Sequence, residues 1–136
     1  MTIQDIQQEI IDEFSFFEDW TERYEYLIEL GKNMPLIDAA YKTDDNLIKG
    51  CQSQVWLHAE KQDGKVVFTA DSDAILTKGI VSLLLRVFTR QSPQDILQAD
   101  TDFINKIGLQ EHLSPTRANG LLAMLKQIKL YALALQ

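Results

Sequence analysis

The sequence has few of the side chains that cross-link a protein or hold a metal. It contains a single cysteine, Cys51, and only two histidines, His58 and His112. One thiol cannot form a disulfide within the chain, which excludes a disulfide-stapled secreted domain. The thiol and the two imidazoles stand at no spacing typical of a zinc site, so the sequence predicts no metal centre.

Long apolar runs and an excess of basic residues are also lacking. The densest apolar stretch, residues 79–88, contains Ser82 and Arg86 and is too short to cross a bilayer. The first residues lack the basic region and apolar segment of a signal peptide, so we expect a cytoplasmic protein. With 20 acidic against 13 basic residues, the net charge of −7 argues against nucleic-acid binding. An acidic surface mainly favours solubility, although it is compatible with basic protein partners.

The composition is that of an ordinary globular domain. The chain has 136 residues, of which 46% are hydrophobic and 24% charged. This length suffices for one buried core, and wholesale disorder is excluded by the apolar content. No repeat, low-complexity segment or linker divides the sequence, so residues 1–136 are predicted to form a single domain.

Apolar residues at helical spacing predict two amphipathic helices at the N-terminal end. The first runs from Ile3 to Phe14, with Thr2 as its cap. The second starts after Asp19 and presents Trp20, Tyr24, Leu27 and Ile28 on one face. Gly31 is expected to end it, because glycine is common just beyond helix C-termini and Pro35 follows shortly after.

The middle of the chain changes to the period of a β-strand. Apolar and polar residues alternate over 55–60 and again over 66–70, and Asp63-Gly64 between them is typical of a two-residue hairpin turn. These segments predict an antiparallel hairpin. The short run 46–48 predicts a third strand ahead of Gly50.

Helices are predicted for the rest of the chain. Ser72 is expected to cap a largely apolar and therefore central helix over 73–89. Ser92-Pro93 and Ser114-Pro115 each combine a cap residue with proline at the first helical position, and a short helix over 102–107 precedes Gly108. The predicted fold class is α+β, with a small antiparallel sheet of about three strands packed against helices.

Cys51 lies in a polar segment, residues 49–54, between two predicted strands. A cysteine is more often a small buried hydrophobe than a reactive group. A structural cysteine usually belongs to an apolar stripe, however, and this one precedes the apolar alternation that begins at Val55. Gly50 allows a tight loop that can carry the side chain to the surface. The segment therefore favours a reactive thiol, with structural packing as the alternative.

A cysteine-dependent hydrolase would need a base beside that thiol. His58 falls within the hairpin and His112 before the last helix, and neither spacing predicts a contact with Cys51. A cysteine–histidine pair formed through space stays open as a second interpretation.

Four blocks of the sequence together resemble the SufE-type sulfur-acceptor proteins, the family that includes SufE and CsdE. They occur in the family's order and cover residues 18–132. The blocks are Trp20–Ile28 followed by Leu30-Gly31-Lys32, then Gly50–Leu57, then Ala70–Ala74 leading to Lys78-Gly79, and finally Gly108-Leu109, His112–Arg117 and Asn119-Gly120-Leu121.

This resemblance implies both a fold and a role. The fold would be the one shared with IscU-type scaffolds. The residue corresponding to the family's acceptor, Cys51, would take sulfane sulfur as a persulfide from a cysteine desulfurase of the SufS or CsdA kind and stimulate that enzyme. The sulfur would pass to a SufB-containing scaffold complex. The chain itself would need no cofactor, because the pyridoxal phosphate belongs to the desulfurase.

The single thiol agrees with a carrier rather than a scaffold. No second cysteine can resolve a persulfide as an internal disulfide, and iron–sulfur clusters are held by several thiolates. Among the matching positions, Arg117 could favour the thiolate and Asp73 could face the desulfurase, while Gln52 and Ser53 could shape the loop. Arg117 could equally face water, and Asp73 could equally complement the dipole of the following helix.

Three hypotheses follow for the function. The first is a sulfur carrier without turnover of its own, which is not an enzyme in the strict sense. The second is a cysteine-dependent hydrolase or thiol transferase, and the third is an interaction module that only activates a desulfurase. A homodimer is compatible with each of them.

Overall fold

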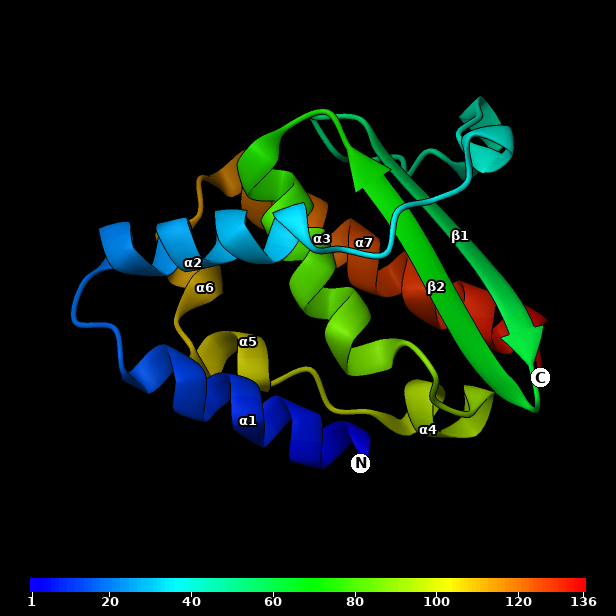
Figure 1. The fold of residues 1–136 in the computed structure, drawn as a ribbon, viewed down its shortest axis with the longest axis horizontal. Helices are drawn as coiled ribbons and strands as arrows, with labels where there is room; N and C mark the ends of the chain where they lie inside the picture. The colour runs from blue at the N-terminus through cyan, green and yellow to red at the C-terminus, as the bar shows by residue number, and fades with distance from the viewer.

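The computed structural model describes residues 1–136, and it combines seven α-helices with one hairpin. In chain order the elements are α1 (Ile3–Ser15), α2 (Trp20–Lys32), the 3₁₀ turns η1 (Ala39–Tyr41) and η2 (Asp44–Asn46), β1 (Val55–Gln62), β2 (Lys65–Ser72), α3 (Ile75–Phe88), α4 (Pro93–Gln98), α5 (Phe103–Lys106), α6 (Leu109–His112) and α7 (Pro115–Ala134) (Figure 1). The predicted α+β class is confirmed. No helix is both long enough and apolar enough to span a membrane.

The hairpin forms where the alternating pattern predicts it. β1 and β2 pair antiparallel from Val55 opposite Ser72 to Gln62 opposite Lys65. The two turn residues, Asp63 and Gly64, have φ angles of 52° and 78°, as a type I′ turn requires. One face of the hairpin is buried, through the alternate residues Val55, Leu57, Ala59, Val66, Phe68 and Ala70.

The predicted third strand is reduced to a single bridge, so the sheet has two strands rather than about three. Leu47 pairs with Trp56 alone. Residues 44–46 coil into η2 and cannot extend the pairing, because a 3₁₀ turn does not present the extended backbone that a ladder needs.

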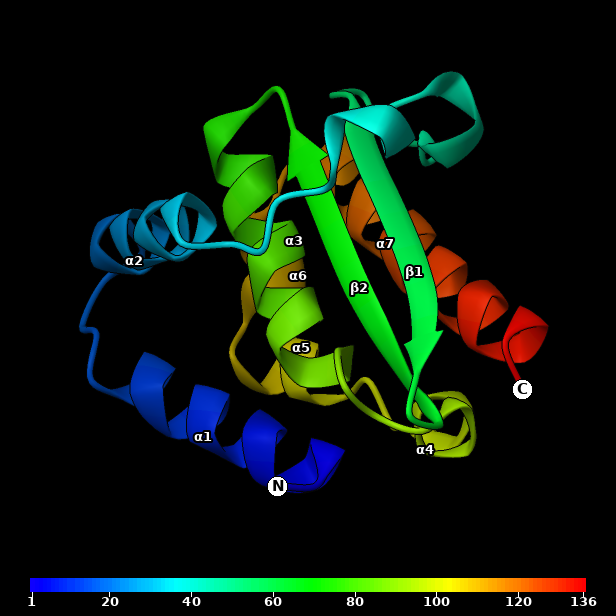
Figure 2. The same cartoon turned by 45° about the vertical axis from the view of Figure 1, so that its right-hand side comes forward.

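In Figures 1 and 2, α7 passes behind the hairpin and α3 lies along its β2 side. In both views α3 stands between β2 and α2, and it is buried on most sides because it contacts each of them. The prediction of a central third helix is thereby confirmed. The last helix, α7, passes behind the hairpin to the C-terminus.

Two glycines let α2 and α3 cross with their backbones in contact. Gly31 was expected to end α2, but the helix continues to Lys32 and Gly31 lies buried within it. A Cβ at Gly31 would lie 2.9 Å from the backbone nitrogen of Gly79, and a Cβ at Gly79 would collide with the carbonyl oxygen of Leu27. Gly31 therefore serves close helix packing and not termination.

The start of α3 also differs from the prediction. Ser72 was expected to cap a helix beginning at Asp73, but it is the last residue of β2 and α3 begins at Ile75. The hydroxyl of Ser72 instead accepts a hydrogen bond from the amide of Ala74 at 3.3 Å. The pairing of Ser72 with Val55 keeps its backbone extended, which excludes a helix start at the next residue.

Four other helices begin with a side-chain cap, three of them at the predicted cap residues Thr2, Ser92 and Ser114, whereas α5 and α6 have none. Thr2, Asp19, Ser92 and Ser114 each accept a hydrogen bond from a backbone amide in the first turn of α1, α2, α4 and α7. Gly108 follows the short helix α5 with a φ of 73°.

Arg86 ties the three helices α1, α2 and α3 together. Its Nη1 donates to Oε1 of Glu13 at 2.8 Å and its Nη2 donates to Oε1 of Glu9 at 3.2 Å. The hydroxyl of Tyr26 on α2 donates to the same Glu13 carboxylate. The hydrogen bonds from Arg86 hold the pKa of Glu13 below its ordinary value.

We expect Gly79→Ala to destabilise the protein by roughly 1–3 kcal/mol, because the added methyl group must push α2 away from α3. Gly120→Ala is the matched control, since Gly120 also lies within a helix, but the atom nearest to its Cβ would be Sγ of Cys51 at 3.4 Å, an ordinary contact distance. The urea midpoint of the control should equal or slightly exceed that of the parent, because alanine is a better helix former than glycine. Urea unfolding measures both, and equal midpoints for Gly79→Ala and the parent would contradict the crossing described here.

We expect Glu13→Gln to lower the free energy of unfolding at neutral pH by about 1 kcal/mol, a value kept small because the pair is partly exposed. The pKa of Glu13 is lower in the folded chain, so its contribution is present above its unfolded pKa of about 4.3 and is lost as the pH falls through the folded pKa. The difference between variant and parent should therefore shrink in acid. Glu29→Gln, at an exposed pair with Lys32, is the control, and a difference that is independent of pH would refute the linkage.

Candidate functional site

Cys51 lies in a loop, residues 49–54, whose two ends are held together. The amide of Ile48 donates to the carbonyl oxygen of Val55 at 2.8 Å, which closes the loop at its base. Gly50 has a φ of 94°, a backbone conformation that residues with a Cβ rarely adopt, and it turns the chain just before the cysteine. The local sequence therefore places the thiol at a tight turn beside the hairpin.

Asp73, the residue after the end of β2, anchors the same loop. The amide of Gln54 donates to Oδ1 of Asp73 at 3.0 Å, and the amide of Asp73 donates to the carbonyl oxygen of Gln54 at 3.2 Å. This reciprocal pair extends the register of the hairpin, in which Val55 opposes Ser72. Neither interpretation of Asp73 from the sequence anticipated this anchoring.

The thiol of Cys51 points toward α7. Its Sγ donates to the carbonyl oxygen of Gly120 at 3.6 Å, and the side chain is half-buried. Burial raises the pKa of the Cys51 thiol above its ordinary value, because the thiolate would lose solvation there. At neutral pH the resting thiol is therefore protonated and weakly nucleophilic.

A pocket of about 230 Å³ opens beside the sulfur. The cysteine loop, α3 and the first turns of α7 form its walls. No aspartate or glutamate lines this pocket, and the lining residues are Cys51, Gln52, Ser53, Thr77, Ser114, Thr116, Arg117, Gly120 and Met124.

The structure brings together most of the residues singled out in the sequence. Gln52, Ser53 and Arg117 line the pocket of Cys51, whereas Asp73 does not. Arg117 is exposed and forms no ion pair, so its guanidinium is free to meet an anion. In the resting structure burial, not Arg117, governs the pKa of the thiol.

Sequence reasoning missed two residues that shape the site. Thr77 of α3 and Gly120 of α7 both face the pocket. Gly120 gave a signal, because glycine within a helical stripe weakens the helix unless something packs closely against it. Thr77 gave no such signal in the sequence, because only tertiary packing brings α3 to the cysteine loop.

Both histidines are engaged away from the thiol. The ring of His58 stacks on Tyr41 with centroids 3.7 Å apart, and its Nε2 lies 3.1 Å from Oε1 of Glu60. The ring of His112 stacks on Trp20 at 4.0 Å, and its Nδ1 lies 3.0 Å from the carbonyl oxygen of Gly108. Neither imidazole lines the pocket of Cys51, so the thiol has no histidine base beside it.

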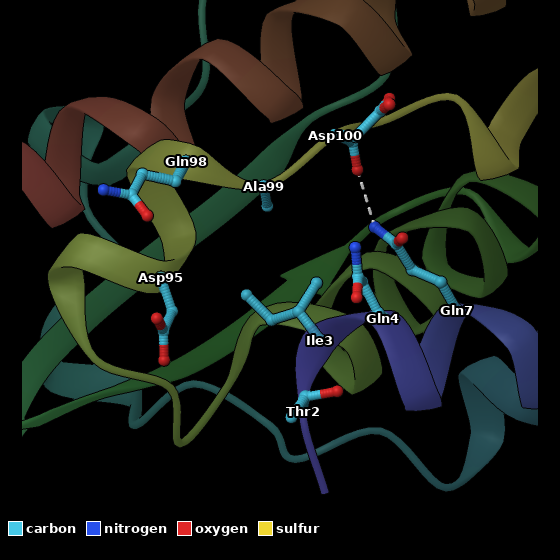
Figure 3. Close-up of a pocket in the computed structure, with 8 residues that line it drawn as sticks. All are labelled: Thr2, Ile3, Gln4, Gln7, Asp95, Gln98, Ala99 and Asp100. Carbon is cyan, nitrogen blue, oxygen red and sulfur yellow. Dashed lines mark hydrogen bonds between the residues drawn. The ribbon is translucent and has the colours of Figure 1, made fainter.

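Other hollows of the surface hold no comparable chemistry. One hollow, of about 290 Å³, lies between the start of α1 and α4. Figure 3 shows its lining residues, among which the side chain of Gln7 donates to the carbonyl oxygen of Asp100. Its lining contains amides and carboxylates but no nucleophile comparable to a thiol. No three histidine, cysteine or acidic side chains gather anywhere in residues 1–136 in a way that could hold a metal ion.

Comparison with known proteins gives consistent matches. The family model of SufE, described as the Fe–S metabolism associated domain, matches residues 8–132. An uncharacterized SufE-like protein of Rhizobium meliloti is 44% identical over 126 residues, covering 89% of this chain and 90% of the relative. SufE-like protein 1, chloroplastic/mitochondrial, of Arabidopsis thaliana is 42% identical over 130 residues, which span 95% of this chain but 35% of that protein.

A solved structure shares the fold. The solution structure of a hypothetical protein from Thermus thermophilus superposes with a TM-score of 0.80, over 96% of this chain and 95% of that chain. The two sequences are 22% identical, so this likeness concerns the fold alone.

We expect Asp73→Ala to release the cysteine loop and speed the alkylation of Cys51 by iodoacetamide at neutral pH by roughly tenfold, because a hydrogen bond to a charged group contributes about 1.5 kcal/mol or more. The pH midpoint of alkylation, raised in the parent by burial, should fall toward that of free cysteine. Asp12→Ala on α1 is the control for lost charge. Identical rates and midpoints in Asp73→Ala and the parent would show that Asp73 does not restrain the loop.

Proposed function

We propose a sulfur-carrier function for this chain, because the chain belongs to the SufE family, the Fe–S metabolism associated domain. Membership assigns it a role in iron–sulfur metabolism. The finer proposal is that Cys51 accepts sulfane sulfur as a persulfide from a cysteine desulfurase, that the chain stimulates this enzyme, and that a SufB-containing scaffold then receives the sulfur.

The observation that carries the proposal is a lone thiol restrained at rest beside a pocket that contains no carboxylate. A carrier must keep its sulfur from stray oxidants and thiols until it meets a partner. The contact with Gly120 and the raised pKa of Cys51 support this, since a protonated, half-buried thiol reacts slowly. Withdrawing the loop from α7 would restore solvation and nucleophilicity.

The transfer step is an exchange between two sulfur centres. The Cys51 thiolate, after losing its proton to solvent, attacks the outer sulfur of the desulfurase persulfide. A new S–S bond forms at Sγ of Cys51 and the S–S bond of the partner breaks. Its electron pair returns to the desulfurase cysteine, so no external oxidant or reductant is consumed.

A hydrolase or thiol transferase has less support. Such an enzyme needs a base within hydrogen-bonding reach of the thiol, and both histidines have partners elsewhere. We therefore propose no independent turnover for this chain. The pyridoxal phosphate of the reaction would belong to the desulfurase.

The test mixes the protein with L-cysteine and an active SufS-type desulfurase and measures its intact mass. We expect Cys51 to gain one sulfur atom and Cys51→Ser to gain none, because the chain has no other thiol. Alanine release by the desulfurase is followed in parallel. Equal stimulation by the parent and Cys51→Ser, with no mass gain in the parent, would favour a pure activator and refute the carrier.

A further inference from the structure

The pocket beside Cys51 has the polarity of an anion receptor. The chain carries 20 acidic residues, yet none lines this pocket. Its polar side chains are hydroxyls and the amide of Gln52, together with the guanidinium of Arg117. Three other charged side chains near the loop, Lys49, Asp73 and Lys78, do not line the pocket. Asp73 accepts a hydrogen bond from the amide of Gln54, and Lys78 pairs with Asp71 at 3.3 Å.

The N-terminal end of α7 adds a positive potential. This helix runs from Pro115 to Ala134, and Ser114, Thr116 and Arg117 in its cap and first turn form one wall of the pocket. The N-terminus of a long helix favours negative charge through its dipole and its free amides.

Thr77 supplies an independent sign of a ligand. Only 6% of its surface is exposed, and its hydroxyl makes no hydrogen bond to another group of the protein. The only side-chain polar atom that is both unpartnered and wholly closed off from solvent is Nε of Arg23. Thr77 lines the pocket, and its hydroxyl, which keeps some access to solvent, has no partner within the protein.

We propose that this pocket receives the outer sulfur of the Cys51 persulfide as an anion and that the Thr77 hydroxyl donates a hydrogen bond to it. The inference rests on the proposed carrier function. Thr77 is a positioning residue here, and the helix end and Arg117 complete the receptor. The pocket of about 230 Å³ has room for one more sulfur atom, which needs roughly the 30 Å³ of a water molecule.

Addition of a second sulfur atom changes which hydrogen bonds the Cys51 side chain can make. The resting thiol donates to the carbonyl oxygen of Gly120, but Sγ of a persulfide has no hydrogen to donate. The outer sulfur ionises more readily than a thiol and then only accepts hydrogen bonds, so it requires the donors that the pocket offers. The same site thus keeps the empty thiol protonated and the carried sulfur anionic.

The experiment loads the full chain without an enzyme. Inorganic polysulfide is added and then removed. In this reaction Cys51–S⁻ plus Sₓ²⁻ gives Cys51–S–S⁻ plus the polysulfide shortened by one sulfur. The intact mass confirms that one sulfur atom was added. The pKa of the persulfide is then read from the pH dependence of its alkylation. We expect this pKa to rise by about one unit in Thr77→Val, because the isosteric side chain removes one hydrogen bond to a charged group.

Thr77→Ser retains the hydroxyl and should restore the parent value, which a merely structural role of Thr77 would not predict. Equal persulfide pKa values in parent and Thr77→Val would overturn the inference. If Thr77→Val does not fold, the parent protein alone tests the inference. The pKa of the Cys51 persulfide should be no higher than that of glutathione persulfide, although the pKa of the Cys51 thiol exceeds that of free cysteine. If the persulfide pKa lay above that of glutathione persulfide by as much as the thiol pKa lies above that of free cysteine, the anion receptor would be refuted. A parent that gains no sulfur from either polysulfide or desulfurase would instead refute the carrier function.

Discussion

Burial of one face of the β1–β2 hairpin against α3 and α7 is the constraint on which the rest of this structure depends. The cysteine loop leads into the first residue of β1, and Asp73 follows the last residue of β2. Because these two strand ends are paired, the loop and Asp73 meet at one end of the hairpin. The same burial brings α7 beneath the loop, so the thiol contacts the carbonyl oxygen of Gly120 and is partly shielded from water.

Close helix packing transmits this arrangement to the other side of the core. α3 can lie between the hairpin and α2 only because Gly31 and Gly79 let two backbones touch. If that crossing opened, α3 would move, and with it Thr77, which precedes Gly79 by two residues in the same helix. The junction of Arg86 with Glu9 and Glu13 holds α1 to the other end of α3. The stability of the fold and the geometry of the site therefore both depend on α3.

The electrostatics of the site suit the proposed carrier, whose sulfur must be unreactive as the free thiol and stable as the persulfide anion. Burial disfavours the thiolate, while the helix end, Arg117 and the hydroxyls favour an anion a short distance further into the pocket. In the proposed persulfide the two effects do not conflict, because they act on different sulfur atoms. A chain with one cysteine needs such protection, since it has no second thiol with which to rescue an oxidised first one.

The sequence by itself determined the local structure and singled out Cys51 as the candidate reactive residue. The hairpin and its turn, four capped helix starts and the single thiol in a polar loop depend on residues close together in the chain, and local patterns report such features. Gly31 and Ser72 were misjudged for the same reason, because their roles are set by Gly79 and by the pairing with Val55. Only the tertiary structure decided the state of the site. Whether Cys51 is shielded, what anchors its loop and which hydroxyl faces it all depend on α3 and α7 crossing beneath the hairpin, a long-range packing arrangement that no local pattern encodes.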